Sequence, residues 1–340
     1  MLFQDKMNKV VAYTKLLRLP GIGALGISTV IAALTVNVSN FIDLCIVFAI
    51  GAIACVFGFI VNDYIDVELD GLVDVLKEKP LVSGAVSKKN VLMIAFCMIF
   101  LSFLLLFILW YGKTIDYYKF LALLCLIIAG FLGSTYDVYG KKIIGSDFLV
   151  ALSVGLIFLF GALAFGKPET ITWIVFVLTF NNILYMNAIQ NGIKDADHDS
   201  TMGVKNIALS LGVHVKGVHL TIPPAFQTFG MGIRLCSVVF LFSPFLFFHY
   251  TYNPWQMVVL TIFTMLFLFV DVKLLTMKIF DRNKIRKNIG IQSFLSYSLV
   301  PLMLISIIGL NRSVLLIFIP ILWYLAFTPL IGEKLFKPRM

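Results

Sequence analysis

The sequence predicts an all-α, polytopic membrane protein: a transmembrane helical bundle of about nine to ten spans. The first observation is composition, since 60% of the 340 residues are hydrophobic and 13% are charged, with a mean hydropathy of +0.98. Soluble domains carry about 25% charged residues. The second observation is a series of apolar runs, each near the ~20 residues that cross a bilayer. The third is that basic residues gather in alternate loops.

Ten apolar runs are candidate spans. The first contains three glycines, the seventh is short, and 205–232 is apolar enough to contain an interfacial helix. We expect a single integral-membrane domain over 1–340. The runs cover residues 21–37, 41–61, 91–111, 118–136, 147–166, 171–190, 235–250, 255–275, 291–310 and 313–332.

The basic residues predict the orientation of these spans. If all ten cross, one side holds 23 of the 27 Lys and Arg, and the other keeps only Lys113, Lys119, Lys167 and Arg312. Cytoplasmic loops carry such an excess, so we expect a multi-pass protein of the cell membrane with its basic loops in the cytoplasm. The net charge of +9 then reflects topology, and no nucleic-acid partner is expected.

Polar residues follow the second and sixth runs in the same pattern. Residues 62–70 read NDYIDVELD and residues 191–199 read NGIKDADHD, so both contain Asn-x3-Asp-x3-Asp. Nine of the eighteen carboxylates fall within 63–78 and 195–199. A motif repeated four spans apart predicts two related four-helix halves that meet at one site.

The spacing of the repeated motif has a chemical meaning. Residues i, i+4 and i+8 share one face of a helix, so each motif would present one amide and two carboxylates together. Oxygen ligands of this kind suit Mg²⁺, which takes one or two carboxylates together with substrate phosphate oxygens. The four scattered histidines, and five cysteines without a CxxC pair, argue against a His or Cys metal site. The alternative is a set of solvated loop acids.

Basic residues lie beside both motifs, and they have two interpretations. Each could be an inside-positive anchor of its span, or it could bind a diphosphate at a site that also holds metal. The residues are Arg18, Lys77, Lys79, Lys141, Lys142 and Lys194.

With these motifs the chain resembles the UbiA superfamily of intramembrane prenyltransferases. NDYIDVELD followed by KPLVSGAVS at 79–87 is similar to the first signature of that family, and IKDADHD followed by GVKNIALSLG at 203–212 is similar to the second. LLRLP at 16–20 and the segment YDVYGKKIIGSDFLVALSVGLIFLFGALA at 136–164 extend the resemblance through most of the chain. The motif loops would be 62–90 and 191–212.

The resemblance implies a helical bundle with a central cavity. It also implies a Mg²⁺-dependent transfer of a prenyl chain from a geranylgeranyl-like prenyl diphosphate to a membrane-associated acceptor. By position, one metal would be held by Asn62, Asp66 and Asp70 and the other by Asp195 and Asp199. The residues with implied catalytic roles are Asp66, Asp195 and Lys194. The implied substrate contacts are Arg18, Lys79, Lys141, Lys142, Asn191 and Tyr139.

The chain departs from the family pattern just before the second motif. Many members carry a Tyr and a Lys where this chain has Asn187 and Asn191, so a cation is missing unless Lys194 replaces it. The resemblance is strongest to the archaeal geranylgeranylglyceryl-phosphate branch, which favours an ether-lipid acceptor. The alternatives are an aromatic acid such as 4-hydroxybenzoate or, from another class, a cation-coupled transporter. A CDP-alcohol phosphotransferase is disfavoured because no Ala-Arg pair follows Gly71 at the required spacing.

Overall fold

Each of the ten apolar runs folds as a helix in the computed structural model, which describes residues 9–331. Without water in the bilayer core, a spanning segment must satisfy its backbone polar groups internally, and a helix does so. The long helices are α2 (Leu19–Thr35), α3 (Phe41–Ile65), α5 (Lys88–Trp110), α6 (Tyr117–Tyr139), α7 (Asp147–Leu163), α8 (Thr170–Leu184), α12 (Pro224–Leu246), α13 (Pro254–Leu275), α14 (Arg282–Met303) and α16 (Leu310–Phe327).

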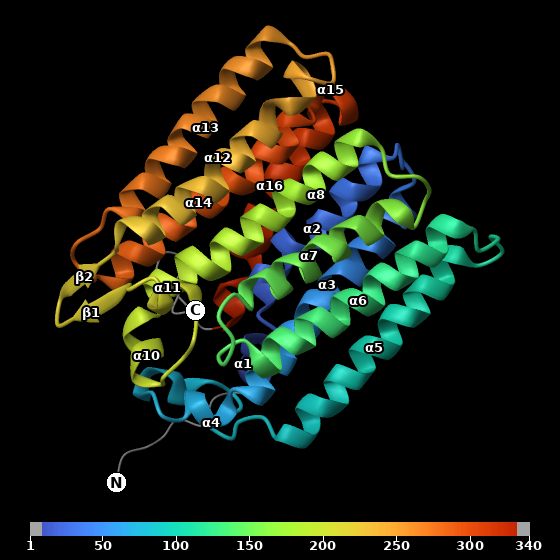
Figure 1. Ribbon diagram of the computed structural model, residues 1–340. Coiled ribbons are helices and arrows are strands. Elements are labelled where there is room, and N and C mark those ends of the chain that lie inside the picture. The colour runs from blue at the N-terminus through green and yellow to red at the C-terminus, as the bar shows by residue number, and fades with distance from the viewer. Residues whose placement is uncertain (1–8, 332–340) are drawn as a thin grey trace.

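Short elements connect the long helices. They are α1 (Lys9–Leu16), α4 (Val67–Asp70), the 3-10 helix η1 (Asp74–Glu78), the π-helix η2 (Tyr185–Asn191), α9 (Gly192–Lys194), α10 (Ala196–Thr201), α11 (Ile207–Ser210), strands β1 (His214–Lys216) and β2 (His219–Thr221), α15 (Ile305–Ile308) and the 3-10 helix η3 (Pro329–Ile331). Figure 1 shows the long helices side by side, with α4, α10, α11 and the two strands gathered at one end of the bundle.

Eight stretches of the described chain are long and apolar enough to cross a membrane. The helix α7 is equally apolar but has only 17 residues, and α14 begins with several charged residues. The stretches Lys9–Thr35 and Thr170–Lys194 are each 56% buried within the protein, whereas Lys88–Trp110 is only 17% buried. The helices α2 and α8 therefore lie inside the bundle, and α5 lies at its edge (Figure 1).

Small residues let α2 approach its neighbours closely. Thr29 on α2 lies against Gly51 of α3, where an added Cβ would come within 2.7 Å of the Thr29 side chain. It also lies against Gly161 of α7, where an added Cβ would be 2.8 Å from the Thr29 Cα. The Thr29 hydroxyl donates to the Val47 carbonyl of α3 at 2.8 Å. Close backbone approach through small residues is how membrane helices commonly associate.

The loops predicted to share one side do meet at one end of the bundle. The N–H of Lys205 donates to the Lys141 carbonyl at 2.9 Å, and Lys141 forms an ion pair with Asp66. Arg282, at the start of α14, pairs with Asp197 of the second motif. The helix α1 packs against η3, which follows α16. The loops that were expected on one side of the membrane therefore lie at one end of the bundle.

The region around 205–232 differs from the expectation. Instead of an interfacial helix it contains the short α11 and an antiparallel β1–β2 hairpin with His214 opposite Thr221. Gly217 takes a positive φ of 62° at the turn of the hairpin, which glycine does without steric cost. The seventh long helix begins at Pro224 rather than near residue 235. Arg234 precedes the seventh apolar run, and the sequence thus predicts it to lie in the loop between the sixth and seventh runs; in the structure it lies inside α12.

Candidate functional site

A polar pocket of about 750 Å³ lies where the motif-bearing ends of the helices meet. The described residues that line it include five carboxylates, four amides and one lysine. The carboxylates are Asp66, Asp137, Asp147, Asp195 and Asp199, the amides are Asn62, Asn187, Asn191 and Asn206, and the lysine is Lys141. Five of the six residues of the duplicated motif therefore line one pocket.

The first motif begins in the last turn of α3 and ends at the last residue of α4. The N–H of Asp66 donates to the Asn62 carbonyl at 2.9 Å, and the N–H of Asp70 donates to the Asp66 carbonyl at 2.8 Å. This backbone pattern stacks the three residues one turn apart, as the spacing predicts. The Asp66 carboxylate is buried, and Lys141 Nζ lies 2.9 Å from its Oδ2. Burial raises the pKa of Asp66 above its usual value, while the Lys141 charge opposes that rise.

Asp70, the third residue of the first motif, points to a neighbouring cluster and not into the pocket. Its Oδ2 lies 2.7 Å from Lys79 Nζ. Lys79 also lies 3.2 Å from Asp63 Oδ1, and the same oxygen accepts from Arg18 Nη2 at 2.8 Å. Arg18 and Lys79, both expected to contact a diphosphate, are thus paired with carboxylates beside the pocket, and neither lines it.

The second motif has the same backbone geometry as the first. The N–H of Asp195 donates to the Asn191 carbonyl at 2.9 Å, and that of Asp199 donates to the Asp195 carbonyl at 2.8 Å. Lys194 Nζ donates to Asn191 Oδ1 at 2.9 Å and lies 3.3 Å from Asp195 Oδ2. The sequence repeat is therefore also a structural repeat, with Lys194 beside the second copy.

Asp199 is the carboxylate of the second motif whose ionisation is most affected by its surroundings. Burial, and secondarily the nearby Asp195 carboxylate, raises the pKa of Asp199 to about 7. The Asn206 amide donates to its Oδ2 at 2.7 Å. Two facing carboxylates in a buried site repel each other, and a cation between them would relieve that repulsion.

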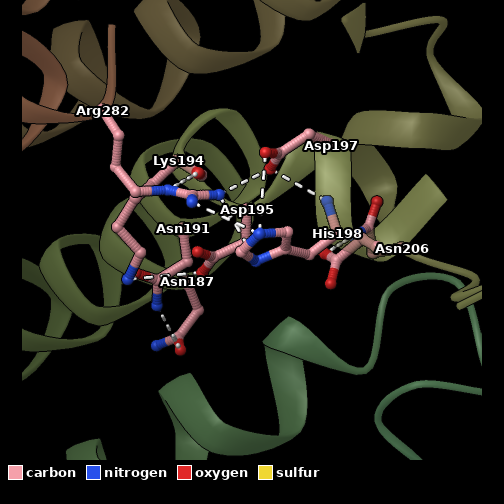
Figure 2. A network of polar contacts seen from close by, with 9 residues as sticks. Asn187, Asn191, Lys194, Asp195, Asp197, His198, Asn206 and Arg282 are labelled. Atoms are coloured by element: carbon pink, nitrogen blue, oxygen red, sulfur yellow. Dashed lines mark hydrogen bonds and ion pairs between the residues drawn. The ribbon is translucent and has the colours of Figure 1, made fainter. Parts of the chain in front are cut away.

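A network centred on Arg282 holds the second motif loop, as Figure 2 shows. Arg282 Nη2 donates to Asp197 Oδ1 at 2.6 Å, and its guanidinium lies 3.3 Å from both ring nitrogens of His198. Its Nε donates to the Lys194 carbonyl at 3.4 Å. This role is not evident from the sequence, because Arg282 reads as one more basic residue of an inside-positive loop.

Some expected residues lie outside the pocket, and some pocket residues were not expected. Tyr139 and Lys142 are exposed and do not line it. Asp137 and Asp147 do line it, although neither belongs to the repeated motif. Their signal in the sequence was two aspartates flanking the short loop between the fourth and fifth apolar runs.

The pocket suits a cation that shares its ligands with a substrate. Within residues 9–331, no three His, Cys, Asp or Glu side chains lie close enough to hold a metal ion by themselves. The pocket nevertheless has five carboxylates and only one lysine among its described lining residues, and its carboxylate and amide oxygens could serve as metal ligands. Mg²⁺ binds through one or two carboxylates, with waters and substrate phosphate oxygens as its other ligands. The donor set therefore fits Mg²⁺ bound together with an anionic substrate.

An apolar pocket of about 900 Å³ lies deeper in the bundle. It is lined by α2, α7, α8, α12 and α14, with smaller contributions from α13 and α16. Ile183 lines the apolar pocket and Asn187 the polar one, and four residues of a helix rise about 6 Å. The predicted cavity is thus a pair of adjacent pockets, polar at the motif end and apolar within the bundle.

The fold and the site define a class: a polytopic helical membrane protein with an acidic pocket at one end of its bundle. Comparison with known families then identifies the chain. It belongs to the UbiA prenyltransferase family, whose family model matches residues 24–296. It is thus a multi-pass membrane protein, and the resemblance inferred from the motifs is confirmed.

Curated relatives carry two different names. The chain is 33% identical over 175 residues to a 4-hydroxybenzoate octaprenyltransferase of Xylella fastidiosa, covering 48% of this chain and 53% of that protein. It is 24% identical over 182 residues to a digeranylgeranylglyceryl phosphate synthase of Methanopyrus kandleri, covering 52% and 60%. The alignments thus span little more than half the length of these relatives.

Solved structures of the family share the fold. A structure described as digeranylgeranylglyceryl phosphate synthase superimposes with a TM-score of 0.64 at 20% identity, covering 89% of this chain and all of that one. A UbiA homologue from Archaeoglobus fulgidus bound to GPP and Mg²⁺ gives a TM-score of 0.61 at 18% identity, covering 88% of this chain and all of that one. At these identities the likeness establishes the all-helical fold.

Proposed function

We propose that the protein is a Mg²⁺-dependent prenyltransferase that moves a prenyl chain from a prenyl diphosphate to a membrane-associated acceptor and releases pyrophosphate. The observation that carries this proposal is that five of the six duplicated Asn and Asp residues line one pocket beside an apolar one. A prenyl diphosphate has the same two parts, a highly charged head and a hydrocarbon tail. Membership of the prenyltransferase family supports the same reaction.

Four motif residues of the polar pocket and two nearby lysines have different roles in this proposal. Asn62 and Asp66 from one motif, with Asp195 and Asp199 from the other, would hold Mg²⁺. Bound Mg²⁺ would neutralise charge on the diphosphate as it leaves. Lys141 and Lys194 each lie within 3.3 Å of one of these carboxylates, from where each can turn to a diphosphate oxygen, as ammonium groups commonly do. Lys194 thus supplies the cation that the chain lacks at Asn187 and Asn191.

The cluster of Arg18, Asp63, Asp70 and Lys79 has a different role in the proposal. Its two cations and two carboxylates neutralise one another, with Asp63 Oδ1 shared by Arg18 and Lys79. The cluster ties the start of α2 to the first motif and so holds α4 in place. Asp70 binds metal only if Lys79 releases it when the substrate enters.

The apolar pocket holds the prenyl chain in this proposal. Its walls keep water from the allylic cation that forms when the carbon–oxygen bond to the diphosphate breaks. The polar groups among its lining residues are few, and one of them, Asn182, accepts a hydrogen bond from Ser296 at 2.6 Å. Residues of α7 line both pockets, and α8 lines the apolar pocket while its continuation η2 lines the polar one. The reacting carbon would lie between the two pockets.

The acceptor we propose is geranylgeranylglyceryl phosphate, in ether-lipid synthesis. The motif segments and a relative named digeranylgeranylglyceryl phosphate synthase support it. An aromatic acid is the second candidate, because relatives at up to 33% identity are named 4-hydroxybenzoate octaprenyltransferase. We further propose that the pocket opens to the cytoplasm from the cell membrane, because the loops around it carry most of the lysines and arginines.

One assay tests the reaction and the acceptor together. The purified protein in detergent is given geranylgeranyl diphosphate, with or without Mg²⁺, and either geranylgeranylglyceryl phosphate or 4-hydroxybenzoate. We expect pyrophosphate release and a prenylated lipid only with Mg²⁺ and the lipid acceptor. Product formed with 4-hydroxybenzoate alone would transfer the assignment to the aromatic acceptor. No Mg²⁺-dependent product with either acceptor, and no binding of the diphosphate, would refute the proposed reaction.

A further inference from the structure

Asp147 is a buried carboxylate that the repeated motif does not account for. It is the first residue of α7, it lines the polar pocket, and it is 6% exposed. Its Oδ2 has no hydrogen-bond partner among the described residues. No ion pair found between residues 9 and 331 includes it. A buried polar atom without a partner costs free energy, so such an atom calls for an explanation.

Three of the other four carboxylates of the polar pocket have polar partners. Asp66 pairs with Lys141 and Asp195 with Lys194, while Asp199 accepts from Asn206. Of the five carboxylates, Asp147 alone has a fully buried oxygen with no hydrogen-bond partner among the described residues.

The backbone before Asp147 is held firmly. The Ser146 hydroxyl donates to the Gly140 carbonyl at 2.8 Å, which closes the turn between α6 and α7. Gly145 in the same turn has a φ of 85°, a conformation that favours glycine. The backbone of this turn therefore sets the position of Asp147 beside the polar pocket.

Asp147 lies on the same helix as a residue of the apolar pocket. Val154, seven residues further along α7, lines the apolar pocket, and seven residues of helix rise about 10 Å. If the diphosphate lies against the two motifs and the prenyl chain lies in the apolar pocket, the reacting carbon lies between them. Asp147 lines the polar side of that interval, in which the hydroxyl group of an acceptor must also lie.

We propose that Asp147 is the catalytic base that takes the proton of the acceptor's hydroxyl group. This proposal rests on the proposed function and applies to an alcohol acceptor. As the carbon–oxygen bond to the diphosphate breaks, its electron pair leaves with pyrophosphate. The acceptor oxygen forms the new bond to the prenyl carbon, and its proton passes to Oδ2 of Asp147. The carboxylic acid then returns the proton to water after product leaves.

The test separates binding from transfer. Asp147→Asn keeps the shape of the side chain but cannot accept the proton. We expect transfer to fall by at least ~10²-fold, since a positioned base contributes that much. Mg²⁺-dependent binding of geranylgeranyl diphosphate should stay within about twofold of the parent, because no contact to the diphosphate is lost. Asp43→Asn serves as the control, because Asp43 lies at the end of α3 that is far from the first motif. It should change neither transfer nor diphosphate binding.

Chemical rescue provides a second readout. In Asp147→Ala, added formate can occupy the emptied space and accept the proton, so transfer should recover in part. Formate should not rescue Asp66→Ala, whose carboxylate we assign to metal binding. Partial recovery in the first variant alone would support a base over a merely structural role.

Four results would overturn the proposal. Asp147→Asn could transfer at the parent rate, or it could lose diphosphate binding, which would make Asp147 a ligand of metal or substrate. Formate could fail to rescue Asp147→Ala. Both variants could fail to fold, as judged by gel filtration and thermal melting, which would make the carboxylate structural. A parent protein that neither binds nor transfers would instead refute the proposed function.

Discussion

The ion pair between Arg234 on α12 and Asp271 on α13 is buried within the bundle, and breaking it should destabilise the protein strongly. Arg234 Nε lies 2.9 Å from Asp271 Oδ2, and the two side chains are 1% and 0% exposed. The guanidinium lies 3.4 Å from the ring centroid of Tyr185 and 4.5 Å from that of Phe267. Tyr185 begins the π-helix η2, which leads into the second motif. The ion pair therefore joins three helices next to the site.

The expected magnitude depends on whether one charge or both are removed. Asp271→Asn leaves a buried guanidinium without its counter-charge, and breaking such a pair costs about 3–5 kcal/mol of unfolding free energy. The double variant Arg234→Met/Asp271→Leu leaves no charge, and hydrophobic replacement of a buried pair is often neutral or stabilising. It also loses the stacking on two rings, worth about 2 kcal/mol when desolvated. The double variant should thus lie within about 2 kcal/mol of the parent.

Unfolding in increasing SDS, followed by circular dichroism, measures these differences in detergent. Asp74→Asn is the matched control because its partner Lys77 and its own carboxylate are exposed, and exposed pairs contribute about 0–1 kcal/mol. If Asp271→Asn cost no more than Asp74→Asn, the pair would not carry the stability assigned to it. A double variant as unstable as the single one would show that shape and hydrogen bonding, and not the isolated charge, account for the loss.

Three further predictions concern the site, the packing and the topology. Asp66→Asn and Asp195→Asn should each lower transfer by at least ~10²-fold, as loss of a preorganised electrostatic group does. The double variant should be little slower than the worse single variant, because the two motifs act as a unit. Gly161→Ala should destabilise the bundle by about 1–3 kcal/mol, since its Cβ would press on the backbone of α2. On a cysteine-free background, Leu72→Cys and Thr114→Cys should react with an impermeant thiol reagent from opposite sides of the membrane.

Each of these predictions has a control and a result that would contradict it. Asp74→Asn should leave transfer nearly unchanged, and fully additive losses in the double motif variant would mean that the motifs serve separate sites. Gly58→Ala should be nearly neutral because no described atom lies within 4 Å of its added Cβ, and equal destabilisation at both glycines would show that contact with α2 is not the cause. Labelling of both cysteines from the same side would overturn the alternating topology.

The helices of this protein and the presence of one shared polar site can be predicted from its sequence. Apolar runs of membrane length become helices because the backbone has no other partner in lipid. The duplicated Asn-x3-Asp-x3-Asp predicted a shared site, and five of its six residues line one pocket. These features depend on local spacing and hydropathy, which a sequence displays directly.

The tertiary structure decided what depends on partners far apart in the chain. Arg234 reads as a loop charge until Asp271, on the next helix, neutralises it inside the bundle. Asp70 follows the metal-ligand pattern, yet Lys79 holds it outside the pocket. Asp147 stands out because its buried Oδ2 has no hydrogen-bond partner among the described residues. The role of a buried charge is set by what lies within a few ångströms, because electrostatic interactions there are strong and desolvation is costly, and sequence spacing does not determine those neighbours.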